Sequence, residues 1–271
     1  MTKRQFLSLL VVLYSFAIIH LHDFFVQLSV VAMNHFSLAT YNSLVQNIIV
    51  VFGVFLVSVT TWKAFKNKRF RLFSFFLFYC LLLFIHWLFL FEMNIEIIHA
   101  FEFGVLALLL YLITENVASA LILCLPIMIF DEINQYVFLY GNYNKYFEFN
   151  DIVLDILGSS IFLFLFKIFE KEPKSVTLPL SKRKEFWLLG LFYFSFLVLT
   201  VSCVFAVHEN AKCSNTIFVL SRIDFPEKFW QHHAFTKAVY HILSPYVGAF
   251  IIFLLCFFSG FSDYLPERKN R

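Results

Sequence analysis

The chain has 271 residues, of which 61% are hydrophobic and only 14% are charged, and its mean hydropathy is +0.79. Soluble domains carry roughly 45–50% apolar and about 25% charged residues, so this composition excludes a soluble globular enzyme, a disordered chain and a disulfide scaffold. A polytopic membrane protein remains, for which the net charge of +3 matters less than the positions of the charges.

Eight runs of mostly apolar residues reach the length of about 20 residues that a membrane-crossing helix needs. In chain order, the spans are expected near residues 5–21, 44–62, 70–91, 97–113, 117–135, 151–169, 186–207 and 240–258. The first run follows Lys3 and Arg4 like a signal peptide, but no small-residue cleavage site follows it, so we interpret it as an uncleaved helix. The sequence therefore predicts an all-α, polytopic transmembrane helix bundle of about eight spans.

The basic residues predict the orientation of this bundle. If the N-terminus is cytoplasmic, 16 of the 21 Lys and Arg residues fall on the inner side. Short inner loops of membrane proteins are enriched in Lys and Arg, so both termini are predicted to be cytoplasmic. For these charges we expect no role beyond setting the topology. With this topology, all nine His residues fall on the outer side.

The spans divide the chain into four predicted parts. These are two N-terminal helices (1–69), a core of four helices (70–170), a charged cytoplasmic linker (171–185) and two C-terminal helices around a long outer loop (186–271). In that loop, His232 and His233 are candidate additional ligands for an outer site. Cys203 and Cys213 both fall on the outer side, but Cys203 is expected inside the seventh helix, so we do not expect a disulfide between them.

Charged side chains inside the spans are the main functional signal, because each costs about 2.5–3.5 kcal/mol on the insertion scale. They form three motifs on the fourth, fifth and sixth spans, namely His99-x-x-Glu102, Asp131-Glu132-x-x-Gln135 and Asp151-x-x-x-Asp155-x-x-Gly158. Within each motif, spacings of three or four residues put the side chains on one helix face. Glu132 is the exception and points about 100° away from Asp131.

The three motifs fall at the same depth, in the outer leaflet. A three-residue turn joins the fourth and fifth spans, and an outer loop of about fifteen residues joins the fifth and sixth. We therefore expect one polar site, whose candidate ligand-binding residues are His99, Glu102, Asp131, Glu132, Gln135, Asp151 and Asp155. Five carboxyls beside one imidazole require protonation or a cationic partner, and Lys145 is the nearest basic candidate. Simpler structural roles are a helix N-terminal acid for Asp151, a solvated interface residue for Glu96 and a helix–helix contact for Gly158.

These three motifs, in this order on successive helices, resemble those of the VanZ-like family of small bacterial membrane proteins. The resemblance covers roughly residues 70–170, with Lys145 where the family often has Arg and Asp155 where Asn is more common. It implies the four-helix core, an outward-facing site, the bacterial cytoplasmic membrane and an envelope role. The namesake of the family is associated with lowered susceptibility to teicoplanin.

Two main functions stay open from the residues. The first is a non-enzymatic protein that binds a membrane lipid or a lipid-linked envelope ligand, with a cationic headgroup favoured by the carboxylates. The second is a metal-dependent intramembrane hydrolase or transferase, in which a divalent ion is held by His99, Glu102, Asp131 and Asp155 while Glu132 acts as base. A coupled transporter is less favoured because the motifs lie at one face and not at the midplane. No nucleic acid partner is expected.

Overall fold

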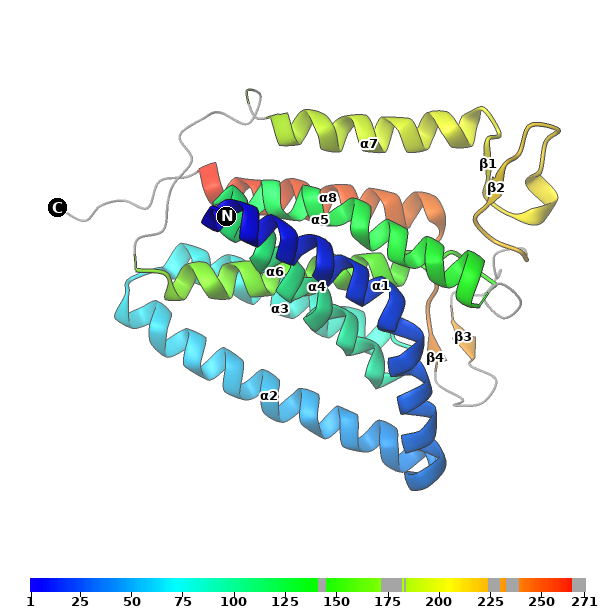
Figure 1. Ribbon diagram of the computed structural model, residues 1–271. Coiled ribbons are helices and arrows are strands. Elements are labelled where there is room, and N and C mark those ends of the chain that lie inside the picture. Colours follow the sequence, from blue (N-terminus) through cyan, green and yellow to red (C-terminus); the bar gives the residue numbers. More distant parts are fainter. Residues whose placement is uncertain (141–144, 172–181, 183, 224–229, 233–238, 265–271) are drawn as a thin grey trace.

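The computed structural model describes residues 1–140, 145–171, 182, 184–223, 230–232 and 239–264. Its α-helices are α1 (Lys3–Phe36), α2 (Leu38–Lys66), α3 (Phe70–Phe89), α4 (Ile97–Thr114), α5 (Val117–Ile133), α6 (Phe149–Phe169), α7 (Lys184–Val201) and α8 (Pro245–Tyr264). A 3₁₀ helix (Asn94–Glu96) precedes α4, another covers Glu209–Ala211, and a π-helix (Asn134–Leu139) extends α5. The predicted all-α bundle is confirmed (Figure 1).

Short strands supply the only sheet among the described residues. Strands β1 (Phe205–Ala206) and β2 (Phe218–Val219) pair in parallel, and β3 (Gln231–His232) pairs antiparallel with β4 (Val239–Tyr240). Both pairs lie at one end of the bundle (Figure 1). We call this the strand end.

Seven described helices are long and apolar enough to cross a membrane, so the chain is a multi-pass membrane protein. Helix α7 corresponds to the predicted seventh span, but its apolar part, Phe186–Val201, is shorter than the others. The seventh span was expected to reach residue 207, which is wrong, because the chain leaves the helix after Val201 and Cys203 adopts a positive φ of 60°.

The first two helices are longer than predicted. Helix α1 has 34 residues and continues to Phe36, well beyond the expected end at residue 21. It would extend about 51 Å at 1.5 Å per residue, against a hydrocarbon core of about 30 Å. The polar residues after the apolar run do not end it, since Gln27 Nε2 donates to Asp23 Oδ2 one turn away at 2.6 Å. The break comes at Ser37, whose φ is 67° and whose hydroxyl accepts from the Thr40 N–H.

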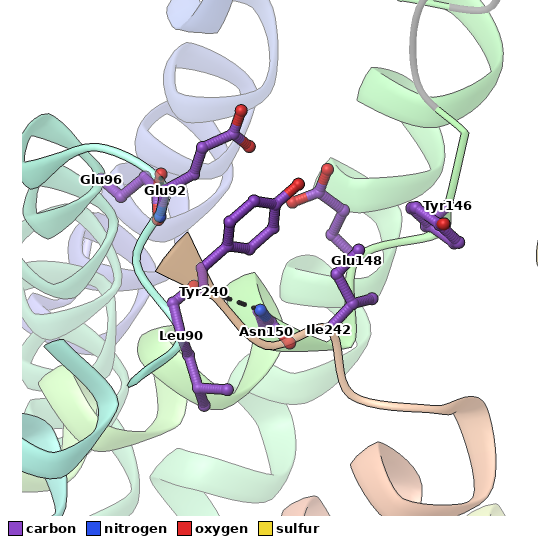
Figure 2. Close-up of a pocket in the computed structure, with 8 residues that line it drawn as sticks. All are labelled: Leu90, Glu92, Glu96, Tyr146, Glu148, Asn150, Tyr240 and Ile242. Atoms are coloured by element: carbon purple, nitrogen blue, oxygen red, sulfur yellow. Dashed lines mark hydrogen bonds between the residues drawn. The ribbon is translucent and has the colours of Figure 1, made fainter. Parts of the chain in front are cut away.

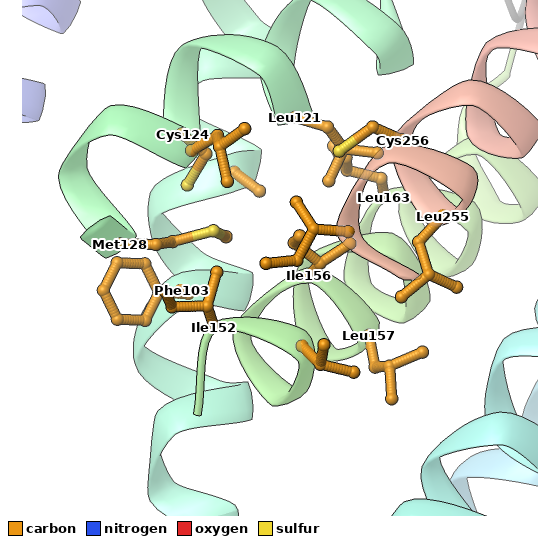
Figure 3. Packing of buried hydrophobic residues seen from close by; sticks show 14 of the residues in the cluster. Phe103, Leu121, Cys124, Met128, Ile152, Ile156, Leu157, Leu163, Leu255 and Cys256 are labelled. Carbon is orange, nitrogen blue, oxygen red and sulfur yellow. The ribbon is translucent and has the colours of Figure 1, made fainter. Parts of the chain in front are cut away.

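The core of the bundle lies around α4, α5 and α6. The apolar window of α6 is 78% buried, whereas that of α2 is only 11% buried. Figure 3 shows side chains of α8, including Leu255 and Cys256, packed with Leu121 and Ile156 in the interior. Gly158 of α6 lies against the Ala100 backbone of α4, so a Cβ at this position would come within 2.4 Å of Ala100 Cα. The helix–helix contact predicted for Gly158 is thus confirmed.

The structure also contradicts a prediction about the outer module, the segment of residues 202–244 between α7 and α8. Cys203 and Cys213 form a disulfide, although the sequence suggested that they would stay unpaired. Because Cys203 lies beyond the end of α7 and not inside it, its side chain can reach Cys213. Disulfides persist in oxidising compartments, which agrees with the predicted outer position of this end.

The last helix begins at Pro245, a residue suited to the first helical turn, and not at residue 240, which belongs to β4.

Basic connections gather at the end of the bundle opposite the strands. Figure 1 shows the start of α1, the α2–α3 connection, the start of α7 and the end of α8 at this end. Arg69 donates to the carbonyls of Lys167 and Ile168 at the end of α6, at 2.5 and 3.1 Å. Arg71 donates in the same way to the last turn of α8. These two arginines therefore cap helix ends, a structural role that sequence reasoning did not assign to them.

Candidate functional site

The centre of the polar site is an imidazole–carboxylate pair between α4 and α6, near the strand end. His99 Nδ1 lies 3.4 Å from Asp155 Oδ1, and the two residues are only 5% and 2% exposed. The pair is brought together by the close approach of the two helices, which Gly158 and Ala100 allow one turn away. The predicted convergence of the His99 and Asp155 motifs is therefore present in the fold.

Asp131 is the most deeply buried acid of the site, at 1% exposure. Its Oδ2 accepts a 3.0 Å hydrogen bond from Gln135 Nε2, as the i,i+4 spacing predicts. Its Oδ1 is buried and has no hydrogen-bond partner in the part of the chain that the structure describes. Electrostatic interactions connect the carboxyl to His99 and to Glu102, so Asp131 belongs to the same group.

The first helix closes one side of the site, which the sequence did not reveal. The Tyr14 hydroxyl donates to the backbone carbonyl of Glu102 at 3.2 Å, and the Glu102 residue is half-buried beside it. The His22 ring lies 5.3 Å from the His99 ring and 6.3 Å from the Tyr140 ring, measured between centroids. The position of His22 among outer polar residues was the only sequence signal. We call His99, Glu102, Asp131, Gln135 and Asp155 the inner cluster.

Glu132 and Asp151 lie between the inner cluster and the strand end. Glu132 is buried, and its Oε1 accepts a 2.8 Å hydrogen bond from the Glu148 backbone N–H. Asp151 is half-buried in the first turn of α6 and interacts electrostatically with His99, Glu132 and Glu148. Its predicted role as a helix N-terminal acid agrees with this position. The seven predicted residues thus form two neighbouring groups, joined at Asp151.

An acidic pocket, which we call the outer pocket, lies beside Asp151, and sequence reasoning missed it. It is lined by Leu90, Glu92, Glu96, Tyr146, Glu148, Asn150, Tyr240 and Ile242 (Figure 2). The cavity measures about 20 Å³, enough for about one water molecule. In Figure 2 the Tyr240 ring lies between Glu92 and Glu96 on one side and Glu148 on the other. Residues from three distant segments meet here, so no local spacing could have indicated the pocket.

Buried hydrogen bonds hold this outer pocket in shape. Asn150 Nδ2 donates to the carbonyls of Leu90 and His241 at 3.2 and 2.8 Å. The Glu96 carboxyl accepts from the Met93 N–H at 2.6 Å, so Glu96 fixes the turn before α4 and is not merely a solvated interface residue. Burial raises the pKa of the Glu148 carboxyl well above its usual range, and the charges of Asp151 and Glu92 add to this effect. Burial likewise raises the pKa of the Tyr240 hydroxyl.

Other candidates lie apart from the inner cluster. Lys145 is exposed, and it forms no ion pair with these carboxylates in the part of the chain that the structure describes. His86 is buried with its ring 5.6 Å from the Phe91 ring. His232 is exposed on β3. His233 and most of the predicted linker at 171–185 lie outside the described residues.

The predicted metal ligands His99, Glu102, Asp131 and Asp155 are close in the fold, but they are not arranged as a coordination sphere. Among residues 1–140, 145–171 and the later described segments, no group of three or more His, Cys, Asp or Glu side chains is placed to hold a metal ion. A divalent metal at this site therefore stays a prediction from the sequence.

No protein-family model, curated protein or solved structure matches the chain. The resemblance to the VanZ-like family consequently rests on the three motifs alone.

Proposed function

We propose that this protein binds a membrane lipid or a lipid-linked cell-envelope ligand at the inner cluster. One observation carries the proposal: Asp131 is 1% exposed, yet its Oδ1 has no hydrogen-bond partner among the described residues. An unsatisfied buried polar group costs about 1–3 kcal/mol, and more when it is charged. Such a group inside a membrane protein marks a functional site by default, because a merely structural carboxyl would be paired or replaced by an apolar residue.

The surroundings of the cluster favour a lipid-like ligand. One face of α2 is open and mostly apolar, and it is formed by Leu44, Asn47, Ile48, Val51, Phe52 and Phe55. The Phe52 ring lies 5.5 Å from the ring of Phe101, the residue before Glu102 on α4. The apolar face of α2 thus touches the segment of α4 that carries Glu102, and the proposal places an acyl chain on this face and the headgroup at the inner cluster.

The VanZ-like resemblance extends this proposal to a bacterial cytoplasmic membrane and an envelope role, glycopeptide resistance included. The alternative, a metal-dependent hydrolase with Glu132 as base, gains no support from the geometry. Glu132 Oε1 already accepts the Glu148 N–H at 2.8 Å, and the residue is 2% exposed. A general base must instead reach the water that it activates.

The test is to purify the protein in a mild detergent and to identify bound lipids by native mass spectrometry. We would compare the wild type with Asp131→Ala and with the control Glu209→Gln, which removes an exposed outer carboxyl paired with Lys212. The proposal predicts that a lipid or envelope precursor remains bound to the wild type and the control but is lost from the Asp131 variant. Identical bound lipids in all three folded proteins would contradict it.

A further inference from the structure

We infer that the ligand of the inner cluster carries a primary ammonium group, which Asp131 and Glu102 bind. This inference rests on the proposed function and specifies the class of its ligand. It depends on the charge balance of the cluster, on the hydrogen-bonding capacity left at Asp131 and on the acidic residues that continue towards the strand end.

The charge balance of the inner cluster calls for protonated carboxyls or for a cation, and the inference takes the cation. The cluster contains three carboxyls, and His99 is its one basic group in the described part of the chain. His99 Nδ1 lies 3.4 Å from Asp155 Oδ1, and a protonated His99 ring balances the charge of that carboxylate. Asp131 and Glu102 interact electrostatically with His99, and Glu102 also interacts with Asp131, so any negative charge that they carry beyond that of Asp155 is left for a further cation to balance. Buried charges are tolerated when they are paired, which favours a cationic partner over a neutral or anionic one.

The Oδ1 atom of an ionised Asp131 needs a hydrogen-bond donor. Gln135 Nε2 donates to Oδ2 at 3.0 Å, which leaves Oδ1 as a buried acceptor without a partner. An ionised phosphate oxygen cannot pair with the ionised carboxylate, because both are acceptors. A primary ammonium offers three N–H donors together with the missing positive charge. A quaternary ammonium has the charge but no N–H, so it would leave Oδ1 unsatisfied.

Acidic side chains continue from the cluster to the strand end. Asp151 interacts with His99 on one side and with Glu148 on the other, and Glu148 lines the outer pocket together with Glu92 and Glu96. A surface lined by charges of one sign raises the local concentration of ions of the opposite sign. A cation that arrives at the strand end meets these carboxyls, and its positive charge favours their ionised forms.

The test uses dioctanoyl lipids that share acyl chains and differ in headgroup. Phosphatidylethanolamine has a primary ammonium, phosphatidylcholine a quaternary ammonium and phosphatidylglycerol no cation. We would titrate each into detergent-solubilised wild type, Asp131→Asn, Glu102→Gln and the control Glu209→Gln, and measure affinity by microcalorimetry. Thermal unfolding checks that each variant is folded, and the half-buried Glu102 provides a second variant if Asp131→Asn does not fold.

The inference predicts that phosphatidylethanolamine binds at least ten-fold more tightly than the other two lipids. Asp131→Asn and Glu102→Gln should remove this preference, whereas Glu209→Gln should keep it. Free ethanolamine is titrated in parallel: competition at similar concentrations would assign the ammonium to a soluble amine, and a much weaker effect would assign it to a lipid headgroup.

Two results would overturn the inference and are distinguishable from each other. Equal affinity for the three lipids, lost in Asp131→Asn, would refute the ammonium while leaving lipid binding in place. No binding of any lipid or of ethanolamine to folded wild type would refute both the ammonium and the proposed function.

Discussion

Replacing Gly158 by alanine should push α4 and α6 apart and disturb the inner cluster. A Cβ on residue 158 would lie 2.4 Å from both Cα and O of Ala100, and these are backbone atoms that cannot rotate away. Ordinary carbon contacts are about 3.5–4.0 Å, so the helices would have to separate by about 1 Å. Overpacking of this kind costs about 1–3 kcal/mol, and the helix-propensity gain of alanine returns about 0.4–1 kcal/mol.

The assay is thermal unfolding in detergent, followed by intrinsic fluorescence of the four Trp residues. These two effects leave a net loss of about 0–2.6 kcal/mol, and we expect a value near the middle, about 1.3 kcal/mol, at about 2–4 °C in Tm per kcal/mol for a chain of this size. The same separation would lengthen the 3.4 Å contact between His99 and Asp155, so ligand binding should weaken as well.

Two other glycines provide matched controls for this prediction. A Cβ at Gly53 or Gly190 would meet no atom within 4 Å, so Gly53→Ala and Gly190→Ala should be neutral or raise the Tm slightly. If Gly158→Ala unfolded at the same temperature as these controls, the close helix contact and the geometry built on it would be refuted.

Three further predictions concern other parts of the molecule. Replacing Cys203 and Cys213 together by Ser should destabilise the outer module by about 2–3 kcal/mol, and alkylation without reductant should label neither Cys in the wild type; labelling of both would contradict the disulfide. Arg71→Ala should lower the Tm through about 1.5–3 kcal/mol of lost charged hydrogen bonds to the last turn of α8, with Arg4→Ala as control; equal melting would refute the cap. Folding raises the pKa of the Glu148 carboxyl. The contribution of this carboxyl to the free energy of unfolding is therefore complete below its pKa in the unfolded chain, and it is lost as the pH rises through its higher pKa in the folded protein. Unfolding measured from about pH 5 to about pH 8 should thus show a decline that Glu148→Gln reduces, and an unchanged profile would refute the burial of this carboxyl.

The sequence was sufficient for the helices but not for their ends. Apolar runs predict membrane spans because the bilayer core tolerates little else. Residues 24–33 are also mostly apolar, but His20, His22 and Asp23 interrupt the run, so a span of ordinary length did not predict one continuous helix to Phe36. Hydropathy also misplaced the end of α7, because the predicted helix included Cys203 and so hid the disulfide.

The candidate site was predictable where its contacts are local. The hydrogen bond between Asp131 and Gln135 follows from their i,i+4 spacing, and the meeting of His99 with Asp155 follows from two motifs at equal depth. The contact of His22 with His99 and the outer pocket around Glu148 depend on packing between distant segments. A single sequence has no period or spacing that encodes such contacts.

The most direct test of ligand binding at the inner cluster is crosslinking with a photoactivatable phosphatidylethanolamine in membranes, mapped by peptide mass spectrometry. The proposed site predicts crosslinks on residues 47–55 of α2 and 98–105 of α4 that fall several-fold in Asp131→Asn, while crosslinks to the lipid-exposed face of α7 around Trp187 and Leu191 stay constant. A uniform crosslinking pattern that Asp131→Asn leaves unchanged would contradict a ligand site at this carboxyl.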